Sequence, residues 1–194
     1  MGVVAVVAIV GGAAFNEYRK ARDTNQAEAL GDAILSALSQ NASDERAASL
    51  RAVDASSAGG DAVLNMLLAA SQADAGSQQD AVNSLNAIAT QGDLPEIYRA
   101  IASFKALLLQ ADTMPVADRR QQFEALAIPG APLRLLAEEQ LALIDVTEGS
   151  TQAALDRLQA LRQDAEASAD LQQRAAQLII ALGGVPEPVA TQQG

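Results

Sequence analysis

The residues of this sequence with most potential for chemistry are carboxylates, because it contains no histidine and no cysteine. Their absence excludes imidazole bases, thiolate nucleophiles and the usual zinc ligands. Glu138 and Glu139 are adjacent, but neighbouring residues of a helix point about 100° apart, so the two do not converge on one proton or metal ion. We interpret this pair as a solvated surface. Asp112 and Asp118 flank Pro115 and are interpreted as turn or capping residues.

Other catalytic motifs are missing as well. The sequence has neither a glycine-rich phosphate loop nor the Gly-x-Ser-x-Gly turn of hydrolases. We therefore predict that the chain is not an enzyme, has no small-molecule substrate and binds no cofactor or metal. Its net charge of −11 also argues against nucleic acid as a partner, because phosphate backbones repel an acidic surface.

The residues best suited to binding a partner lie in the segment 94–111, which we predict to be helical. Its spacing groups four large side chains in one stripe that we expect to be buried: Ile97, Ile101, Phe104 and Leu108. Polar residues on the other faces are our candidate partner-binding residues: Arg99, Ser103 and Gln110. Arg99 stands out in an acidic chain, and an arginine beside a groove can bind a carboxylate through two hydrogen bonds. The alternative is an intramolecular ion pair with Glu96 or another acidic residue.

Helices must position these residues, since no stretch alternates for long enough with the period of two that is typical of a β-strand. Amphipathic spacing runs from Asp23 to about Gln40, and a short helix follows from Asp44. Between glycine and proline breakers we predict helices over 61–75, 78–91, 94–111, 116–127, 132–147, 150–165 and 168–182. The chain is thus expected to comprise an anchor and basic junction, a connector, a repeat domain and a disordered tail, over residues 1–22, 23–60, 61–184 and 185–194.

An internal repeat indicates that these helices are paired. The segment that begins at Gly76-Ser77 matches the one that begins at Gly149-Ser150, 73 residues later, and shares a Gln, an Ala and a Leu at the same spacing. This offset is about twice the period of a helix–turn–helix repeat. The intermediate copy, near residues 112–126, lacks the glycine and the alanine, so we predict a degenerate middle unit.

These units resemble the tetratricopeptide pattern. The large–small pair of the first helix, the turn glycine and the small residue of the second helix are Leu68-Ala69, Gly76 and Ala81 in one unit, and Leu141-Ala142, Gly149 and Ala154 in the other. The resemblance implies an all-α fold of stacked antiparallel helix pairs, a degenerate tetratricopeptide-like solenoid. In such stacks the first helices of the pairs line the concave face.

An uncharged, largely aliphatic run covers residues 2–15, and a basic cluster of Arg19, Lys20 and Arg22 follows it. As a helix this run would be roughly 21 Å long, whereas a bilayer core is about 30 Å thick. We interpret it as the C-terminal part of a transmembrane helix that begins upstream of Met1. A signal peptide and a buried helix of a soluble domain remain alternatives.

This layout is similar to a family of bacterial inner-membrane proteins, the ancillary subunits of the SecYEG translocon, which have a single span, a short connector and a tetratricopeptide-like domain. The resemblance implies a periplasmic repeat domain that links the translocon to periplasmic chaperones. The basic cluster by itself would instead place the repeat domain in the cytoplasm.

The sequence therefore predicts a single-pass inner-membrane protein whose repeat domain is a protein–protein interaction scaffold. We expect a helix or an extended segment of a partner to bind along the first helices of each pair. Two alternatives stay open: a soluble or peripheral self-assembling helical protein, and a single-span accessory subunit of another membrane complex.

Overall fold

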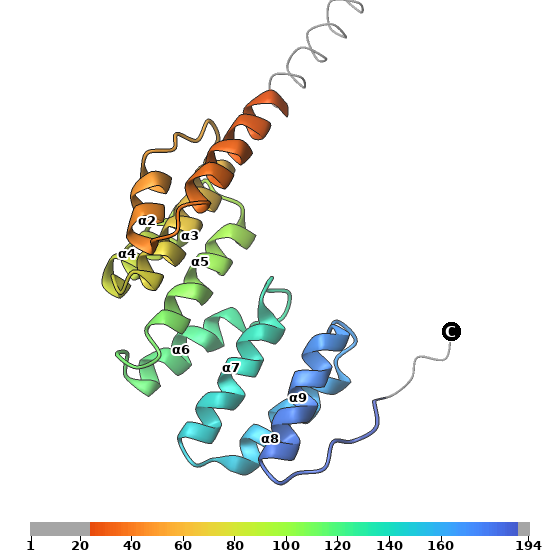
Figure 1. Cartoon of the computed structure of the whole chain (residues 1–194). Helices are drawn as coiled ribbons and strands as arrows, with labels where there is room; N and C mark the ends of the chain where they lie inside the picture. The colour runs from red at the N-terminus through yellow and green to blue at the C-terminus, as the bar shows by residue number, and fades with distance from the viewer. Residues whose placement is uncertain (1–23, 190–194) are drawn as a thin grey trace, which may run out of the picture. The chain divides into compact units, whose positions relative to one another are not determined.

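The structure, a computed structural model, describes residues 24–189, and every regular element among them is a helix. A helical segment covers 24–38, and eight helices follow it (Figure 1): α2 (Ser43–Arg51), α3 (Ala58–Asp74), α4 (Gln78–Ala89), α5 (Glu96–Leu109), α6 (Val116–Leu126), α7 (Arg134–Thr147), α8 (Thr151–Gln163) and α9 (Ala169–Ala181). The predicted all-α class is confirmed, and the seven helices predicted within 61–182 correspond in order to α3–α9.

The chain forms two compact units that divide after Ile88. In the first unit, α2 packs against α3, and the segment 24–38 contributes to the same core, which contains Ala37, Ala47, Leu50, Leu64 and Leu68. Ser57 caps α3, since its hydroxyl accepts a hydrogen bond from the Gly60 N–H at 3.1 Å. A Cβ on Gly60 would lie 2.8 Å from Leu30 Cδ2, so glycine lets these two segments approach closely.

The second unit contains α5 to α9, and each of these helices packs against the next one. One core cluster joins α5, α6 and α7: Leu107, Phe123, Ala137, Leu141 and Ile144. A second cluster joins α7, α8 and α9: Ala142, Leu158, Leu161, Leu171, Ala175 and Ile179. Because α7 contributes to both clusters, its position determines how the other helices of this unit pack.

Three helices end in the same turn. Gly76, Gly149 and Gly183 have φ values of 79°, 77° and 82°, and in each case the next residue donates its N–H to the carbonyl five positions earlier. This is the Schellman motif, which places its glycine in the left-handed region. Gly149 and Gly183 lie 34 residues apart, which is the period of a tetratricopeptide repeat.

The 73-residue offset also appears in the side-chain hydrogen bonds. In two helix pairs, a Gln at the start of the second helix donates to the residue four positions on, and a later residue donates to the last turn of the first helix. These bonds are Gln79–Asn83 (3.0 Å) and Ser84–Gln72 (3.1 Å) in α3–α4, and Gln152–Asp156 (2.8 Å) and Arg157–Asp145 (3.1 Å) in α7–α8. The repeated sequence therefore makes corresponding hydrogen bonds in both places.

Helix α5 buries smaller side chains than we predicted. Ile97 and Leu108 are 40% and 42% exposed, and Ile101 and Phe104 are half-buried, so none of the four residues of the predicted stripe is fully buried. The buried face instead carries Ala100, Ala102, Ala106 and Leu107. Alanines allow neighbouring helices to approach closely, and this leaves the larger residues at the margins of the contact.

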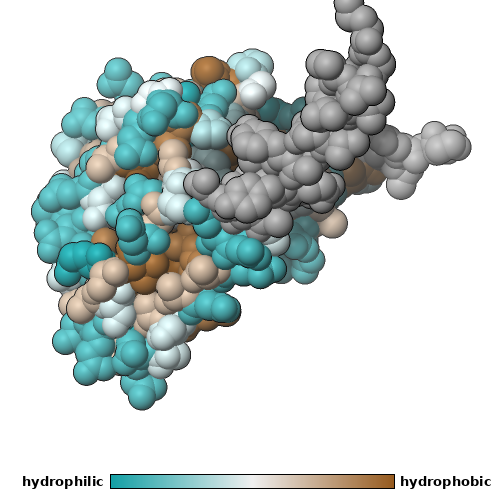
Figure 2. All heavy atoms as spheres, turned by 90° about the horizontal axis from the view of Figure 1, so that it is seen from above, coloured by the Kyte–Doolittle hydropathy of each residue, from teal (hydrophilic) through white to brown (hydrophobic). Residues whose placement is uncertain are grey.

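The surface is largely polar, with apolar residues exposed among the polar ones. In Figure 2, hydrophilic side chains cover much of the face that is seen from above, and hydrophobic ones are visible between them. No helix within residues 24–189 is long and apolar enough to cross a membrane. The predicted anchor, at residues 1–22, lies outside the described residues.

Replacement of Gly149 by alanine should lower the free energy of unfolding by about 1–2 kcal/mol, because an L-residue at a left-handed position is strained. As a control, Gly31→Ala should raise it by roughly 0.5–1 kcal/mol, since Gly31 lies inside a helix with open space around its Cβ position. Urea unfolding monitored by circular dichroism measures both changes. Equal effects of the two substitutions would contradict the role of the turn.

Candidate partner-binding site

A hollow of about 190 Å³ lies among α5, α6 and α7. We call it the α5–α7 groove, and its lining consists of Leu107, Leu108, Ala111, Arg119, Phe123, Gln140, Leu143, Ile144 and Thr147. Helices α5 and α7 are the first helices of successive pairs. The groove therefore lies along the helices on which we expect a partner to bind.

The groove has a packed apolar floor and an exposed apolar rim. Phe123 is 1% exposed and contacts Phe104 edge to face, with ring centroids 5.6 Å apart. Ile144 is buried beside it, whereas Leu108 and Leu143 on the rim are 42% and 38% exposed. Large apolar side chains that meet solvent over a rigid floor form a suitable pocket for an apolar side chain of a partner.

Arg119 is the charged residue of the groove. Its guanidinium donates a hydrogen bond to the Ala111 carbonyl, just after the end of α5. Its Nε atom is buried without a hydrogen-bond partner, and no ion pair within residues 24–189 includes it. A positive charge beside an apolar groove favours a partner segment that carries both apolar and acidic side chains.

The three residues predicted for partner binding are on α5 or at its end, but none of them lines the groove. Gln110 ends α5, and its side chain donates to the Ala106 carbonyl at 2.9 Å, so it serves the helix end. Arg99 and Ser103 are half-buried. The Nε atom of Arg99 is buried without a hydrogen-bond partner, and no ion pair with Glu96 or another acidic residue forms in the described part of the chain.

Sequence reasoning missed Leu108, Leu143 and Arg119 as groove residues. Leu108 fits the helical spacing of a buried stripe, and only the packing of α5 reveals that it is exposed. Leu143 follows Leu141 and Ala142 in an apolar run. The run does not reveal that Leu143 lies on the face of the helix opposite to the buried Leu141. The sequence does carry one signal for Leu143. The apolar run to which it belongs covers more of the helix surface than packing against one neighbouring helix requires.

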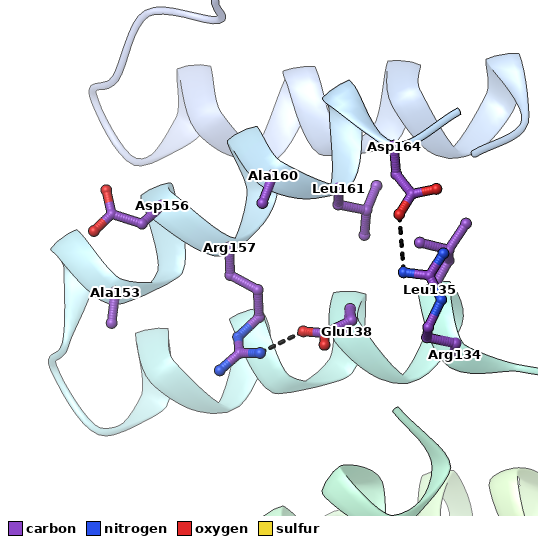
Figure 3. A pocket seen from close by; sticks show the side chains of 9 residues that line it. All are labelled: Arg134, Leu135, Glu138, Ala153, Asp156, Arg157, Ala160, Leu161 and Asp164. Atoms are coloured by element: carbon purple, nitrogen blue, oxygen red, sulfur yellow. Dashed lines mark hydrogen bonds and ion pairs between the residues drawn. The ribbon is translucent and has the colours of Figure 1, made fainter. Parts of the chain in front are cut away.

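A second hollow, of about 480 Å³, lies between α7 and α8 (Figure 3). It uses residues of α7 about half a turn away from those in the groove, so the two hollows are on opposite faces of α7. Both of its arginines are paired, since Arg134 contacts Asp164 at 2.8 Å and Glu166 at 2.6 Å, and Arg157 contacts Glu138. Asp156 accepts a hydrogen bond from Gln152 at 2.8 Å. Arg134 holds the pKa of Asp164 below its usual value by donating a hydrogen bond to it. These pairs join the helices and leave the hollow little capacity for a charged ligand.

Asp145 lies at the centre of the largest ion-pair network. Its carboxylate, whose side chain is 5% exposed, contacts Arg120 of α6 at 2.6 Å and Arg157 of α8 at 3.1 Å. Arg120 also contacts Glu148 at 2.6 Å, and Arg157 contacts Glu138. The network therefore joins three consecutive helices through one buried carboxylate.

Glu138 and Glu139 are not the solvated pair that we predicted. Glu139 is 8% exposed and accepts two hydrogen bonds of 2.9 Å from Arg174 of α9, whereas Glu138 pairs with Arg157 of α8. These hydrogen bonds raise the pKa of Arg174 above its usual value. The two carboxylates do point to different neighbours, as their helical offset requires, but both are used in helix packing.

Known proteins give no further assignment for the groove. No family model matches the chain, and no curated protein or solved structure matches it. Within the described residues, no three potential ligands among His, Cys, Asp and Glu converge as a metal site would require. The candidate site therefore depends on its geometry alone.

Replacement of Asp145 by asparagine should lower the free energy of unfolding by about 3 kcal/mol, because two arginines would lose their shared buried carboxylate. The matched control is Glu166→Gln: Glu166 is 76% exposed, and Arg134 keeps Asp164, so the loss should stay below about 1 kcal/mol. Thermal and urea unfolding measure both variants. A loss for Asp145→Asn no larger than that of the control would show that the network does not hold the helices together.

Proposed function

We propose that this chain is a protein–protein interaction scaffold and that the α5–α7 groove binds a partner segment. The observation that carries this proposal is the exposure of Leu108 and Leu143 over the buried ring of Phe123. Isolated exposed leucines are common, but two that flank one hollow form a contiguous apolar surface.

The partner segment is an amphipathic helix with an acidic flank. A hollow of about 190 Å³ accommodates one large apolar side chain, and a helix presents such side chains at regular intervals along a groove between two helices. Arg119 at the margin of the groove then contacts an acidic residue of the same segment. Arg99, on α5, provides a second basic contact if the bound segment extends along that helix.

The scaffold is tethered to the bacterial inner membrane through a single span, and its repeat domain lies in the periplasm. Support comes from the uncharged run at residues 2–15 and from the resemblance to the ancillary subunits of the SecYEG translocon. On this proposal the partners are the translocon and periplasmic chaperones, and the protein performs no catalysis. The lack of histidine and cysteine in the sequence agrees with a binding role.

Leu143→Glu should reduce photo-crosslinking of the partner to the groove, here called capture, at least tenfold, because it places a carboxylate on the apolar rim. In cells that express the full-length protein, a photo-crosslinking residue introduced at Gln140 should capture the partner, which mass spectrometry then identifies. Arg99→Ala and Arg119→Ala should each weaken capture and leave the fold nearly unchanged.

The matched control is Ile180→Glu, which introduces the same charge at a residue on α9 that is 62% exposed. It should leave capture unchanged. Equal capture by wild type, Leu143→Glu and Ile180→Glu would eliminate the groove as the binding site.

Membrane association distinguishes this scaffold from the alternative, a soluble or peripheral self-assembling protein. The full-length natural protein should remain in the membrane pellet after carbonate extraction. High pH releases peripheral proteins but does not extract a helix that spans the bilayer. Its release into the supernatant, together with concentration-dependent oligomers in sedimentation velocity, would favour the alternative.

A further inference from the structure

The segment 185–188 lies along α8, in a part of the chain for which we predicted disorder. Gln159 binds it at two points: its Nε2 donates to the Val185 carbonyl at 2.8 Å, and its Oε1 accepts from the Glu187 N–H at 3.2 Å. Arg162 donates to the Glu187 carbonyl at 2.6 Å, and Gln163 donates to the Pro188 carbonyl at 2.9 Å. We call these three residues of α8 the ladder.

The ladder binds the main chain of the tail and not its side chains. Each of these four hydrogen bonds uses a backbone carbonyl or N–H of the tail, while Val185, Glu187 and Pro188 are exposed. Gln159, Arg162 and Gln163 share one face of α8, because they are three and four positions apart. Because these hydrogen bonds use only main-chain groups, another extended segment can provide the same donors and acceptors.

Arg162 lacks the partner that its charge favours. It is 9% exposed, and no ion pair within residues 24–189 includes it. Its hydrogen bonds go to neutral oxygens of Glu187 and Gln159, and its Nε atom is buried without a partner. Buried arginines are normally paired with a carboxylate, and hydrogen bonds to a carboxylate are roughly twice as strong as neutral ones.

We propose that the ladder is a binding site for an extended, acidic segment of another protein and that residues 185–188 occupy it in the free chain. The tail provides the main-chain hydrogen bonds but no carboxylate for Arg162. A partner segment with Asp or Glu at the position of Pro186 supplies both. Pro186 is half-buried between the exposed residues Val185 and Glu187, which is the alternation of an extended chain whose middle side chain points toward the helix.

This site is independent of the α5–α7 groove. Its residues are on α8 and the tail, whereas the groove is lined from α5, α6 and α7. Leu143→Glu should leave ladder binding unchanged, and ladder variants should leave capture at the groove unchanged. Failure of one proposal therefore does not imply failure of the other.

The test requires a variant that releases the tail and keeps the ladder. Gly184→Val serves this purpose, because a Cβ at Gly184 would lie 2.8 Å from Leu155 Cδ2 and 3.0 Å from Ile179 Cγ2. The probes are two fluorescent, end-blocked peptides of sequence Val-Glu-Glu-Pro-Val and Val-Gln-Glu-Pro-Val, which differ only in one charge. Anisotropy titrations with the full chain measure both affinities.

The Glu peptide should bind Gly184→Val about tenfold more tightly than the Gln peptide does. Its affinity for the wild type should be at least tenfold lower, because the tethered tail competes at a high effective concentration. Adding Arg162→Met to Gly184→Val should abolish the preference for Glu. Adding Gln152→Ala, a change two turns before Gln159 at a side chain that donates to Asp156 and not to the tail, should preserve it.

Equal affinities of the two peptides for Gly184→Val would overturn the proposal, as would dimerisation of that variant by exchange of tails in light scattering. If Gly184→Val does not fold, hydrogen exchange in the otherwise wild-type chain decides the matter. Pro186→Glu should protect the Glu187 N–H about tenfold more than Pro186→Gln does, and Arg162→Met should remove that difference. Equal protection in the two tail variants would also overturn the proposal.

Discussion

The arrangement of α6, α7 and α8 depends on the buried carboxylate of Asp145. A lone buried charge would destabilise the fold by several kcal/mol, but two arginines approach this one from opposite neighbours. The backbone carbonyl of Asp145 also accepts a hydrogen bond from Ser150 at 2.8 Å, which closes the turn to α8. One residue thus aligns two helix contacts and one helix end.

The helix pair α3–α4, which contains the other copy of the repeat, makes the corresponding contact between uncharged side chains. At the corresponding positions of α3 and α4, Gln72 accepts a hydrogen bond from Ser84, and the Gln72 carbonyl closes the turn at Gly76. The shared geometry comes from the Schellman turn and the small residues, since both are present in the two pairs. The charged version joins a third helix, because an arginine reaches further than a serine and a carboxylate accepts from two donors at once.

Most arginines of the second unit form ion pairs that join neighbouring elements. The arginines that do not are therefore candidates for contacts with a partner. Arg120, Arg134, Arg157 and Arg174 each pair with a carboxylate of a neighbouring element. Arg99, Arg119 and Arg162 instead have a buried Nε atom without a hydrogen-bond partner. In a chain with a net charge of −11, arginines that remain without an internal carboxylate are the natural contacts for acidic segments of other proteins.

The sequence by itself determined the helices, their order and the repeat. Helical periodicity, glycines after helix ends and prolines at helix starts are local signals, so they predicted α3–α9 and the 73-residue offset. Only the tertiary structure decided which large residues are buried, because burial depends on the neighbours that each helix finds. Leu108 and Leu141 both fit a helical stripe, yet Leu141 is 1% exposed and Leu108 lies on a groove. Ion pairs such as Glu139–Arg174 link residues 35 positions apart, and no local pattern encodes such a distance.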